Sequence, residues 1–240
     1  MNSEEYDRMY SLEDTYWWYV ARRELALKLI NLHHVPGRRA VDVGCGTGAL
    51  LAELCKNFDA DGFDLSTKAI DFCHERGLSS ASVGNAEQLP AQSSAYDLAV
   101  TLDLLEHVDD DVAAIGELHR ILAPGGLLVI NVPAFRWLWG PHDVALHHHR
   151  RYTARELRRK LLAAGFTVER MSYSVFLLFG VVVFRRLLDK FSRGPATVKL
   201  PRVSPSMNAF LLKLMRFESR LLESIPLPFG SSVVAVARKK

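Results

Sequence analysis

The fold of this chain is decided by the stretch Val41-Asp42-Val43-Gly44-Cys45-Gly46-Thr47-Gly48-Ala49-Leu50, in which an apolar strand enters a glycine-dense turn that opens a helix. Glycine permits positive φ and brings backbone N–H groups within reach of a ligand, so this turn is typical of a nucleotide-binding site. Gly44, Gly46 and Ala49 satisfy the loose G-x-G-x-x-G/A dinucleotide pattern, which by itself is a weak signal. Other residues must therefore decide the ligand.

Two carboxylates near the turn narrow the choice. Asp42 lies inside the strand, where a buried strand ordinarily carries an aliphatic residue. Asp64 ends the next strand-like run, about twenty residues further on, where a carboxylate can accept hydrogen bonds from both hydroxyls of a ribose. Dinucleotides and S-adenosylmethionine (SAM) both carry that ribose, so both ligands stay open at this point.

The composition fits one globular domain with additions. Of the 240 residues, 49% are hydrophobic and 24% are charged, which provides a core and excludes a disordered chain. The first residues are polar and partly acidic, unlike a signal peptide, and the three cysteines have no metal-ligand spacing. We therefore expect a cytoplasmic protein with reduced thiols. The net charge of +3 is too small to predict nucleic-acid binding.

Strand-like and helical runs alternate along the chain, and this pattern predicts a doubly wound, Rossmann-like α/β fold with a mostly parallel sheet. The expected strands are 40–44, 60–64, 80–83, 96–101, 126–132 and 166–173, and the expected helices between them are 48–57, 67–76, 109–122 and 154–164. A helical extension is expected at 4–33, and a last strand at 232–238.

Further motifs follow the glycine turn in a defined order. They are Val83-Gly84-Asn85-Ala86-Glu87-Gln88-Leu89-Pro90, then Tyr96-Asp97-Leu98-Ala99-Val100 through Leu105-Glu106-His107-Val108, and then Leu122-Ala123-Pro124-Gly125-Gly126-Leu127-Leu128-Val129-Ile130. With these motifs the chain resembles the class I SAM-dependent methyltransferases over residues 36–173. The resemblance implies a seven-stranded sheet in which the last strand runs antiparallel beside the sixth.

The resemblance also implies three parts of the chain. Residues 1–35 would form a helical extension over the cofactor site, and residues 36–173 with 230–240 would form the SAM-binding core. Residues 174–229 replace the usual short link before the last strand, and we expect a helical cap there. Its two helices are expected at 175–191 and 206–224, joined by a linker at 194–205.

The resemblance assigns cofactor contacts to individual positions. The glycines of the turn would pack against the methionine and ribose of SAM, and Asp42 would face the ammonium group. Asp64 would hold the ribose hydroxyls, Leu65 would lie against the adenine, and Asn85 with Ala86 would sit at the adenine edge. The full set expected to contact SAM, or its product S-adenosylhomocysteine, is Trp17, Arg22, Asp42, Gly44, Cys45, Gly46, Gly48, Asp64, Leu65, Ser66, Asn85, Ala86 and Leu102.

The N-terminal extension carries an aromatic cluster. Trp17, Trp18 and Arg22 resemble the W-W-[FY]-x-x-R signature of a bacterial branch of these methyltransferases. The H-D-x-x-x-x-H-x-x-R-Y loop of the same branch is present from His142 to Tyr152. In that setting the aromatic helix closes over bound SAM, and packing of the helix onto the sheet is the alternative.

The histidine-rich loop at 133–152 is expected to build the acceptor pocket, because loops at this end of a doubly wound sheet carry function. Histidine readily takes a proton near neutral pH. We expect His142, or one of His147 to His149, to act as general base, with Asp143 as its orienting partner. The candidate catalytic residues are His142, Asp143, His107 and His147.

A metal site is an open alternative in this region. Asp103, Glu106 and His107 resemble the E-x-x-E-H cluster of the ubiquinone-pathway O-methyltransferases, where such side chains hold a divalent ion. A hard cation there would chelate acceptor oxygens and lower the pKa of a hydroxyl. The favoured interpretation is a post-strand turn that binds no metal, with His107 near the acceptor.

The segment before the last strand raises the question of membrane contact. Residues 173–184 are apolar and uncharged, but a membrane span needs roughly twenty such residues. Arg185 and Arg186 follow at once, which is typical of a helix lying in a membrane interface. If this segment contacts a membrane, we expect the contact at the inner face of that membrane. The alternatives are that the segment covers a pocket for a hydrophobic acceptor, or that it forms an ordinary buried pair of helices.

The sequence therefore predicts a SAM-dependent methyltransferase that acts, in the favoured interpretation, on an oxygen of a small-molecule or lipid-linked acceptor. An NAD-type oxidoreductase that uses the same glycine turn is one alternative. A non-catalytic binding subunit with the same fold is the other.

Overall fold

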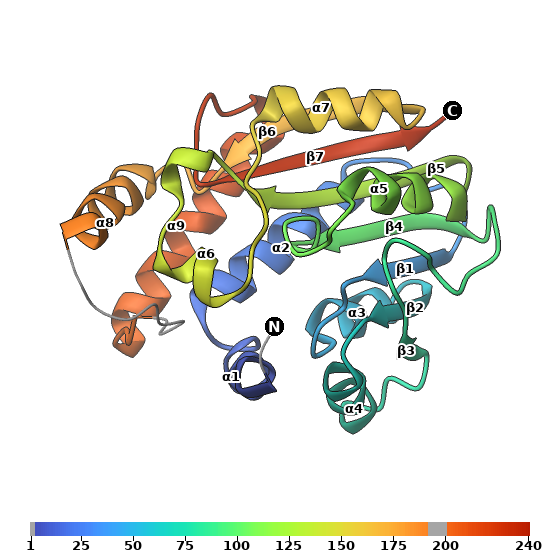
Figure 1. The fold of residues 1–240 in the computed structure, drawn as a ribbon, viewed down its shortest axis with the longest axis horizontal. Helices are drawn as coiled ribbons and strands as arrows, with labels where there is room; N and C mark the ends of the chain where they lie inside the picture. The colour runs from blue at the N-terminus through green and yellow to red at the C-terminus, as the bar shows by residue number, and fades with distance from the viewer. Residues whose placement is uncertain (1–2, 192–200) are drawn as a thin grey trace.

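A single seven-stranded sheet organises the molecule, as seen in a computed structural model that describes residues 3–191 and 201–240. The strand order is β3-β2-β1-β4-β5-β7-β6, and β7 alone runs antiparallel to its neighbours (Figure 1). The strands are β1 Arg39–Val43, β2 Asp59–Asp64, β3 Ala81–Val83, β4 Tyr96–Leu102, β5 Leu122–Pro133, β6 Phe166–Ser174 and β7 Ser232–Lys239. The predicted fold class is confirmed, including the antiparallel last strand.

Helices cover both faces of the sheet. They are α1 Ser3–Leu12, α2 Trp17–Asn31, α3 Ala49–Leu54, α4 Thr67–Glu75, α5 Asp111–Ile121, α6 Pro141–Ala145, α7 Ala154–Ala163, α8 Phe179–Phe191 and α9 Pro205–Ser224, with a 3₁₀ turn, η1, at Arg136–Leu138. The apolar side chains of α5 and α7 pack on one face, and those of α2, α3, α4 and α9 pack on the other. Because both faces are covered, the central strands are apolar on both sides.

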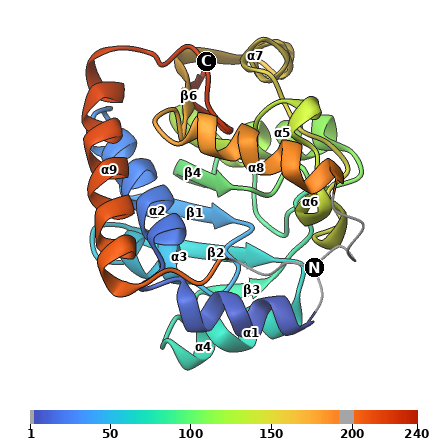
Figure 2. The ribbon, with the colours of Figure 1, turned by 90° about the vertical axis from the view of Figure 1, so that its left-hand side faces the viewer.

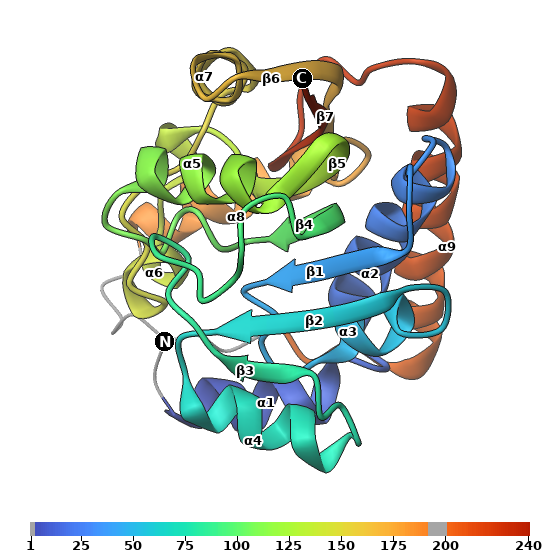
Figure 3. The same cartoon turned by 90° about the vertical axis from the view of Figure 1, so that its right-hand side faces the viewer.

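The chain reverses its direction of progress across the sheet between β1 and β4. From β1 it moves outward to β2 and β3, and then returns to place β4 on the other side of β1. Figure 3 shows the arrowheads of β1, β2 and β4 pointing to the same side of the molecule. In open parallel sheets the ligand crevice lies beyond the carboxyl ends of the strands at such a reversal. The fold therefore places a crevice next to the glycine turn.

The structure differs from the prediction in a few segments. β5 begins at Leu122, where it pairs with Tyr96, rather than at residue 126. The long loop after β5 contains η1 and α6, which are too short to give a periodic signal. Most of the expected linker at 194–205, namely 194–200, lies outside the described residues.

The N-terminal extension and the segment between β6 and β7 pack on each other. Figure 2 shows α2 and α9 side by side. Arg216 forms a salt bridge to Glu24 at 2.6 Å, and the backbone N–H of Trp17 donates to Asn208 at 2.9 Å. Exposed ion pairs contribute little, about 1 kcal/mol or less, so apolar burial must hold the two helices together. Leu222 of α9 supplies part of it and is 1% exposed.

Replacing Leu222 with Ala should lower the free energy of unfolding by about 2–5 kcal/mol, because a cavity opens beneath α9. Urea denaturation measures the change. Phe217→Ala on the same helix, where the side chain is 53% exposed, is the matched control and should change it by about 0.5 kcal/mol or less. Equal losses for the two variants would show that α9 is not anchored through its buried face.

Candidate active site

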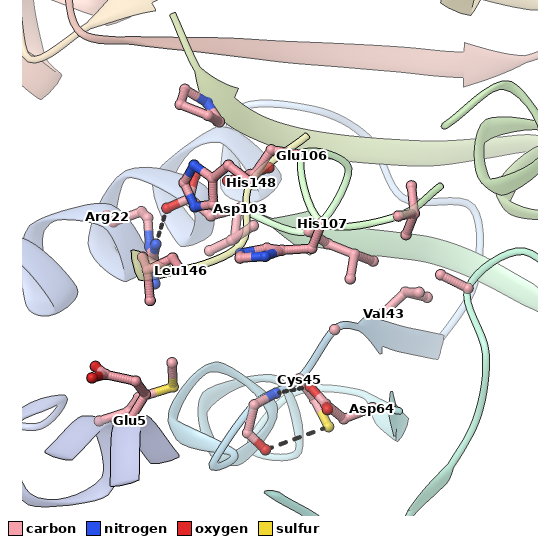
Figure 4. A pocket seen from close by; sticks show the side chains of 18 of the residues that line it. Glu5, Arg22, Val43, Cys45, Asp64, Asp103, Glu106, His107, Leu146 and His148 are labelled. Carbon is pink, nitrogen blue, oxygen red and sulfur yellow. Dashed lines mark hydrogen bonds and ion pairs between the residues drawn. The ribbon is translucent and has the colours of Figure 1, made fainter. Parts of the chain in front are cut away.

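A cavity of about 600 Å³ lies along the carboxyl edge of the sheet, which is an ordinary size for a small-molecule site. Figure 4 shows side chains from both of its sides. Its walls come from α1, α2, the turn after β1, the ends of β2 and β4, the turn after β3, the loop after β5 and α8. One continuous space therefore joins the glycine turn to the histidine-rich loop.

The glycine turn is held against the end of β2. The backbone N–H groups of Gly44 and Cys45 both donate to the carbonyl oxygen of Phe63, at 2.7 and 3.0 Å. Gly44 and Gly46 have φ of 79° and 54°, in the left-handed region that side chains with a Cβ disfavour. The glycines thus let the turn fold back over β2 and expose its backbone to the cavity.

Asp64 is fixed at the edge of this turn. Its Oδ2 accepts from the backbone N–H of Gly46 at 3.0 Å, and its Oδ1 accepts from that of Ser66 at 2.9 Å. The hydroxyl of Tyr6 lies 3.4 Å from Oδ1. Burial raises the pKa of the Asp64 carboxyl above its usual range, while the two backbone donors oppose the rise. Oδ2 has one donor and keeps a lone pair for a ligand hydroxyl, whereas Oδ1 faces both Ser66 and Tyr6.

Asp42 is the most unusual charged group of the site. It is 2% exposed, and burial together with the nearby Asp64 raises its pKa to about 8. A carboxyl group in this position is protonated at neutral pH and ionises when a cation approaches. The cavity therefore contains, next to the glycine turn, a carboxyl group that becomes negatively charged when a cation binds nearby.

The structure brings the residues predicted to contact adenine, together with Leu102, to the cavity wall. Leu65 lies on the wall and is 73% exposed, which leaves an apolar surface for a flat ring. Asn85, Ala86 and Leu102 also line the cavity. The side-chain oxygen of Asn85 accepts from the backbone N–H of Glu87 at 2.9 Å and so stabilises the turn after β3.

An ion pair ties α2 to the end of β4. Arg22 donates to Oδ2 of Asp103 (Figure 4). The side-chain amide of Asn131 donates to Oδ1 of Asp103 at 2.6 Å. Asp103 itself has φ of 53°, which turns the chain sharply after the strand. Asp103 is thus engaged with Arg22 and Asn131, and it is not part of the group of ligand atoms that lie close enough together to share a metal ion. The structure instead places ligand atoms of Glu106, His107 and His148 within 4.8 Å of one another.

Burial disfavours the charged forms of Glu106 and His107. Glu106 is 1% exposed, and its Oε2 has no hydrogen-bond partner among the residues that the structure describes. Burial and the neighbouring Asp103 raise the pKa of its carboxyl well above the usual range. Burial, with a contribution from His148, lowers the pKa of His107 to about 3. Burial and Arg186 similarly lower the pKa of His142 to about 4.

Asp143 lies beneath the histidine-rich loop and organises it. The carboxylate is fully buried and accepts from the backbone N–H of Gly140 at 2.8 Å and from Arg151 at 2.7 and 3.1 Å. It also pairs with Nδ1 of His148 at 2.9 Å. Despite burial, these donors hold the pKa of Asp143 well below its usual range. The carboxylate requires a proton on Nδ1 of His148, so Nε2 is left as the basic nitrogen.

Some predicted site residues lie away from the cavity wall. Trp17 packs between α2 and α9 beside Met215, and its indole N–H is buried with no partner in the described part of the chain. Gly48 is the N-cap of α3, and Ser66 caps α4 by accepting from the backbone N–H of Ala69. Asp143 pairs with His148 and does not orient His142. The other predicted residues of the site lie on the wall.

Other wall residues were missed by the sequence analysis. Tyr6 and Met9 come from α1, and Trp18 from α2 faces the cavity where its neighbour Trp17 was expected. Nothing in the local sequence shows that α1 folds back over the glycine turn, because that placement depends on α4. His148 was one of three adjacent histidines, and only its contact with Asp143 distinguishes it.

Residues 17–170 match the model of a family described as a methyltransferase domain. The chain belongs to this family. A probable S-adenosylmethionine-dependent methyltransferase of Mycolicibacterium smegmatis is 29% identical over 171 residues, which cover 65% of this chain and 62% of that protein. A ubiquinone biosynthesis O-methyltransferase of Paraburkholderia phymatum is 34% identical over 109 residues, covering 42% of this chain and 47% of that protein. The chain thus spans about half to three fifths of these curated relatives.

Solved methyltransferases share the fold of this methyltransferase domain. A SAM-dependent methyltransferase of Thermotoga maritima superposes with a TM-score of 0.62 at 20% identity, covering 99% of this chain and 96% of that one. A geranyl diphosphate C-methyltransferase of Streptomyces coelicolor gives 0.61 at 16% identity, with 92% and 80% covered. The family and the fold favour SAM over a dinucleotide as the ligand of the glycine turn.

The buried Asp42 predicts how the stability of the methyltransferase domain depends on pH. In the unfolded chain this carboxyl releases its proton near pH 4, whereas in the folded protein it keeps the proton up to about pH 8. Because the folded state binds more protons in this window, the free energy of unfolding should fall as the pH rises from about 4 to about 8. Asp42→Asn should remove this part of the slope and stabilise the free protein at pH 8.

Urea denaturation at several pH values measures this effect. Asp109→Asn is the control, because the Asp109 side chain is 90% exposed and its loss should leave the slope of the wild-type protein unchanged. If Asp42→Asn and the wild type showed the same pH slope, Asp42 would not be protonated in the folded protein.

Proposed function

We propose that this chain is a SAM-dependent methyltransferase that methylates an oxygen atom of a hydrophobic acceptor. The observation that carries the proposal is the continuity of the cavity. At one end lie the glycine turn and Asp64, and at the other end lies His148, whose Nδ1 pairs with the buried Asp143 behind the wall. A methyl donor and an acceptor placed at these two ends would meet within one cavity, and positioning supplies much of the catalysis for such a transfer.

The residues at the donor end fit SAM. Asp64 would accept hydrogen bonds from the ribose hydroxyls, and its position is fixed by Gly46 and Ser66. Asp42 would ionise beside the positively charged groups of the methionine part. Leu65 would cover the adenine, and α1 would close the site through Tyr6 and Met9. When bound, SAM supplies a methyl group on a positively charged sulfur.

His148 is the base that the geometry supports among the candidate histidines. His107 and His142 have pKa values lowered to about 3 and about 4, so both are weak bases. The buried carboxylate of Asp143 pairs with Nδ1 of His148 at 2.9 Å. This carboxylate stabilises the imidazolium that forms when Nε2 takes up a proton. Asp143, expected to orient whichever of His142 and His147 to His149 acts as the base, is therefore assigned to His148 in this proposal.

The proposed reaction is a single displacement. The acceptor hydroxyl gives its proton to Nε2 of His148, and its oxygen forms a bond to the methyl carbon as the bond from that carbon to sulfur breaks. S-adenosylhomocysteine and the methyl ether are the products, and the proton leaves His148 to solvent. Oxygen as the methylated atom is supported by the relatives named as ubiquinone biosynthesis O-methyltransferases.

Asp64→Asn tests the donor end. The wild type should bind SAM and S-adenosylhomocysteine in isothermal titration, and the variant should bind each about ten to a hundred times more weakly, because charged hydrogen bonds to the ribose are lost. Asp59→Asn, an exposed change at the other end of β2, should bind like the wild type. Binding of NAD without binding of SAM or its product would refute the proposal.

His148→Asn tests the acceptor end. With methyl-labelled SAM and organic extracts as the source of acceptor, the rate of label transfer should fall about a hundredfold or more, since the general base is removed. The affinity for SAM should stay within about twofold, because His148 is far along the cavity from Asp64. His34→Asn, at an exposed position between α2 and β1 away from the cavity wall, is the control. Unchanged transfer by His148→Asn would exclude it as the base.

A further inference from the structure

Helix α8 carries an apolar face that is turned toward solvent. Val181, Phe184, Leu187 and Leu188 are 65%, 63%, 49% and 51% exposed. Their spacing of three and four residues places them on one side of the helix. An amphipathic helix on a globular protein ordinarily turns such a face inward. The outward face of α8 therefore needs a partner.

The opposite face of α8 belongs to the cavity. Val182 and Arg186 line it, and Arg186 lies 3.7 Å from the carboxylate of Asp143. Figure 2, which looks at the carboxyl edge of the sheet, shows α8 lying across the front of the strands. A single helix thus separates the acceptor end of the cavity from an exposed apolar surface.

Aromatic side chains extend this surface at the beginning of α8. Phe179 packs against Trp137 of η1 and Phe229, with ring centroids 5.9 and 5.2 Å apart. Trp137 is 53% exposed and Phe229 is 41% exposed. Tryptophan and other aromatic rings at the boundary of an apolar surface are typical of proteins that sit at the level of lipid headgroups.

The charge of the same surface is one-sided. The exposed charged residues of 136–138 and 179–188 are Arg136 and Arg185, and no Asp or Glu occurs in these two ranges. Basic residues near a bilayer contribute about 1 kcal/mol each when the lipids are anionic. A second copy of the chain fits less well, because symmetric pairing would bring like-charged arginines together around the apolar residues.

We propose that the α8 surface, defined as Val181, Phe184, Leu187 and Leu188 with Trp137 and Phe229, binds an anionic membrane. At 1.5 Å per residue the 13-residue helix is about 20 Å long, shorter than a bilayer core. In keeping with this, the helices within 3–191 and 201–240 include none with the length and hydropathy of a membrane span. α8 lies flat in the headgroup region, with its inner face on the cavity.

This contact also defines the acceptor, a step that rests on the proposed function. A lipid-linked hydroxyl compound would pass from the bilayer beneath α8 into the cavity beside Val182. The catalytic end then never has to bind a free hydrophobic molecule from water. Membrane binding itself depends only on the surface residues and is measured without any methyl transfer.

Flotation with vesicles tests the proposal on the full chain. The wild type should float with vesicles in which about a third of the phosphatidylcholine is replaced by phosphatidylglycerol, and less with phosphatidylcholine alone. Raising the salt concentration should reduce the difference in floating fraction between the anionic and the phosphatidylcholine vesicles, because salt screens the charges. Negligible flotation with both kinds of vesicle would overturn the proposal.

A double variant locates the contact. Phe184→Glu with Leu188→Glu should reduce the bound fraction on anionic vesicles about tenfold or more, because two charges would have to enter the interface. Val112→Glu with Leu162→Glu, at positions 60% and 50% exposed on α5 and α7, is the matched control and should float like the wild type. Equal losses in the two double variants would overturn the assignment to α8.

Two further measurements distinguish membrane binding from loss of the fold and from self-association. Titration of each variant with SAM shows that the fold and the donor end are intact, so a failure of the proposed function is distinguished from a failure of membrane binding. Light scattering after size exclusion reports the mass in solution. The contrary outcome is a wild type that forms a dimer, which the double variant Phe184→Glu with Leu188→Glu dissociates, and that fails to float with vesicles. That result would assign the α8 surface to a second copy of the chain and refute the proposed membrane binding.

Discussion

The hydrogen bonds that hold the glycine turn against the end of β2 are the constraint on which the rest of the site depends. Gly44 and Cys45 share the carbonyl oxygen of Phe63, and Gly46 donates to Asp64. The backbone can make these bonds only because the glycines take positive φ. They place an exposed turn and a fixed carboxylate at the point where the strand order reverses, and the other walls of the cavity are built around that pair.

Three buried carboxyl groups of the site show how burial and hydrogen bonding compete. Asp143 is fully buried yet has a depressed pKa, because Arg151, His148 and a backbone N–H all donate to it. Asp42 and Glu106 have raised pKa values, since they lack comparable donors. Burying such groups costs stability. Asp143 is therefore a structural anchor, whereas the other two are poised to respond to a ligand that brings charge or protons.

The segment between β6 and β7 adds two helices, α8 and α9, to the core of the fold. α9 is fixed on α2 and so joins the two additions to the core, while α8 lies over the carboxyl edge with Val182 and Arg186 on the cavity. This arrangement makes one helix both a wall of the acceptor end and an exposed apolar surface. In the proposed membrane contact, access to the cavity and binding to lipid would both depend on the position of α8.

The sequence by itself determined the parallel sheet, the glycine turn and the positions of Asp42 and Asp64, because these follow from local backbone preferences and from hydrophobic periodicity within short segments. The sequence did not distinguish His148 from the neighbouring histidines. It also did not show that Trp18, Tyr6 and Met9, and not Trp17, line the cavity. Those choices depend on how α1, α2 and the loop after β5 pack against distant elements. Only the tertiary structure decided them, since the side chains that meet in the cavity come from segments far apart in the chain and no local pattern records their contact.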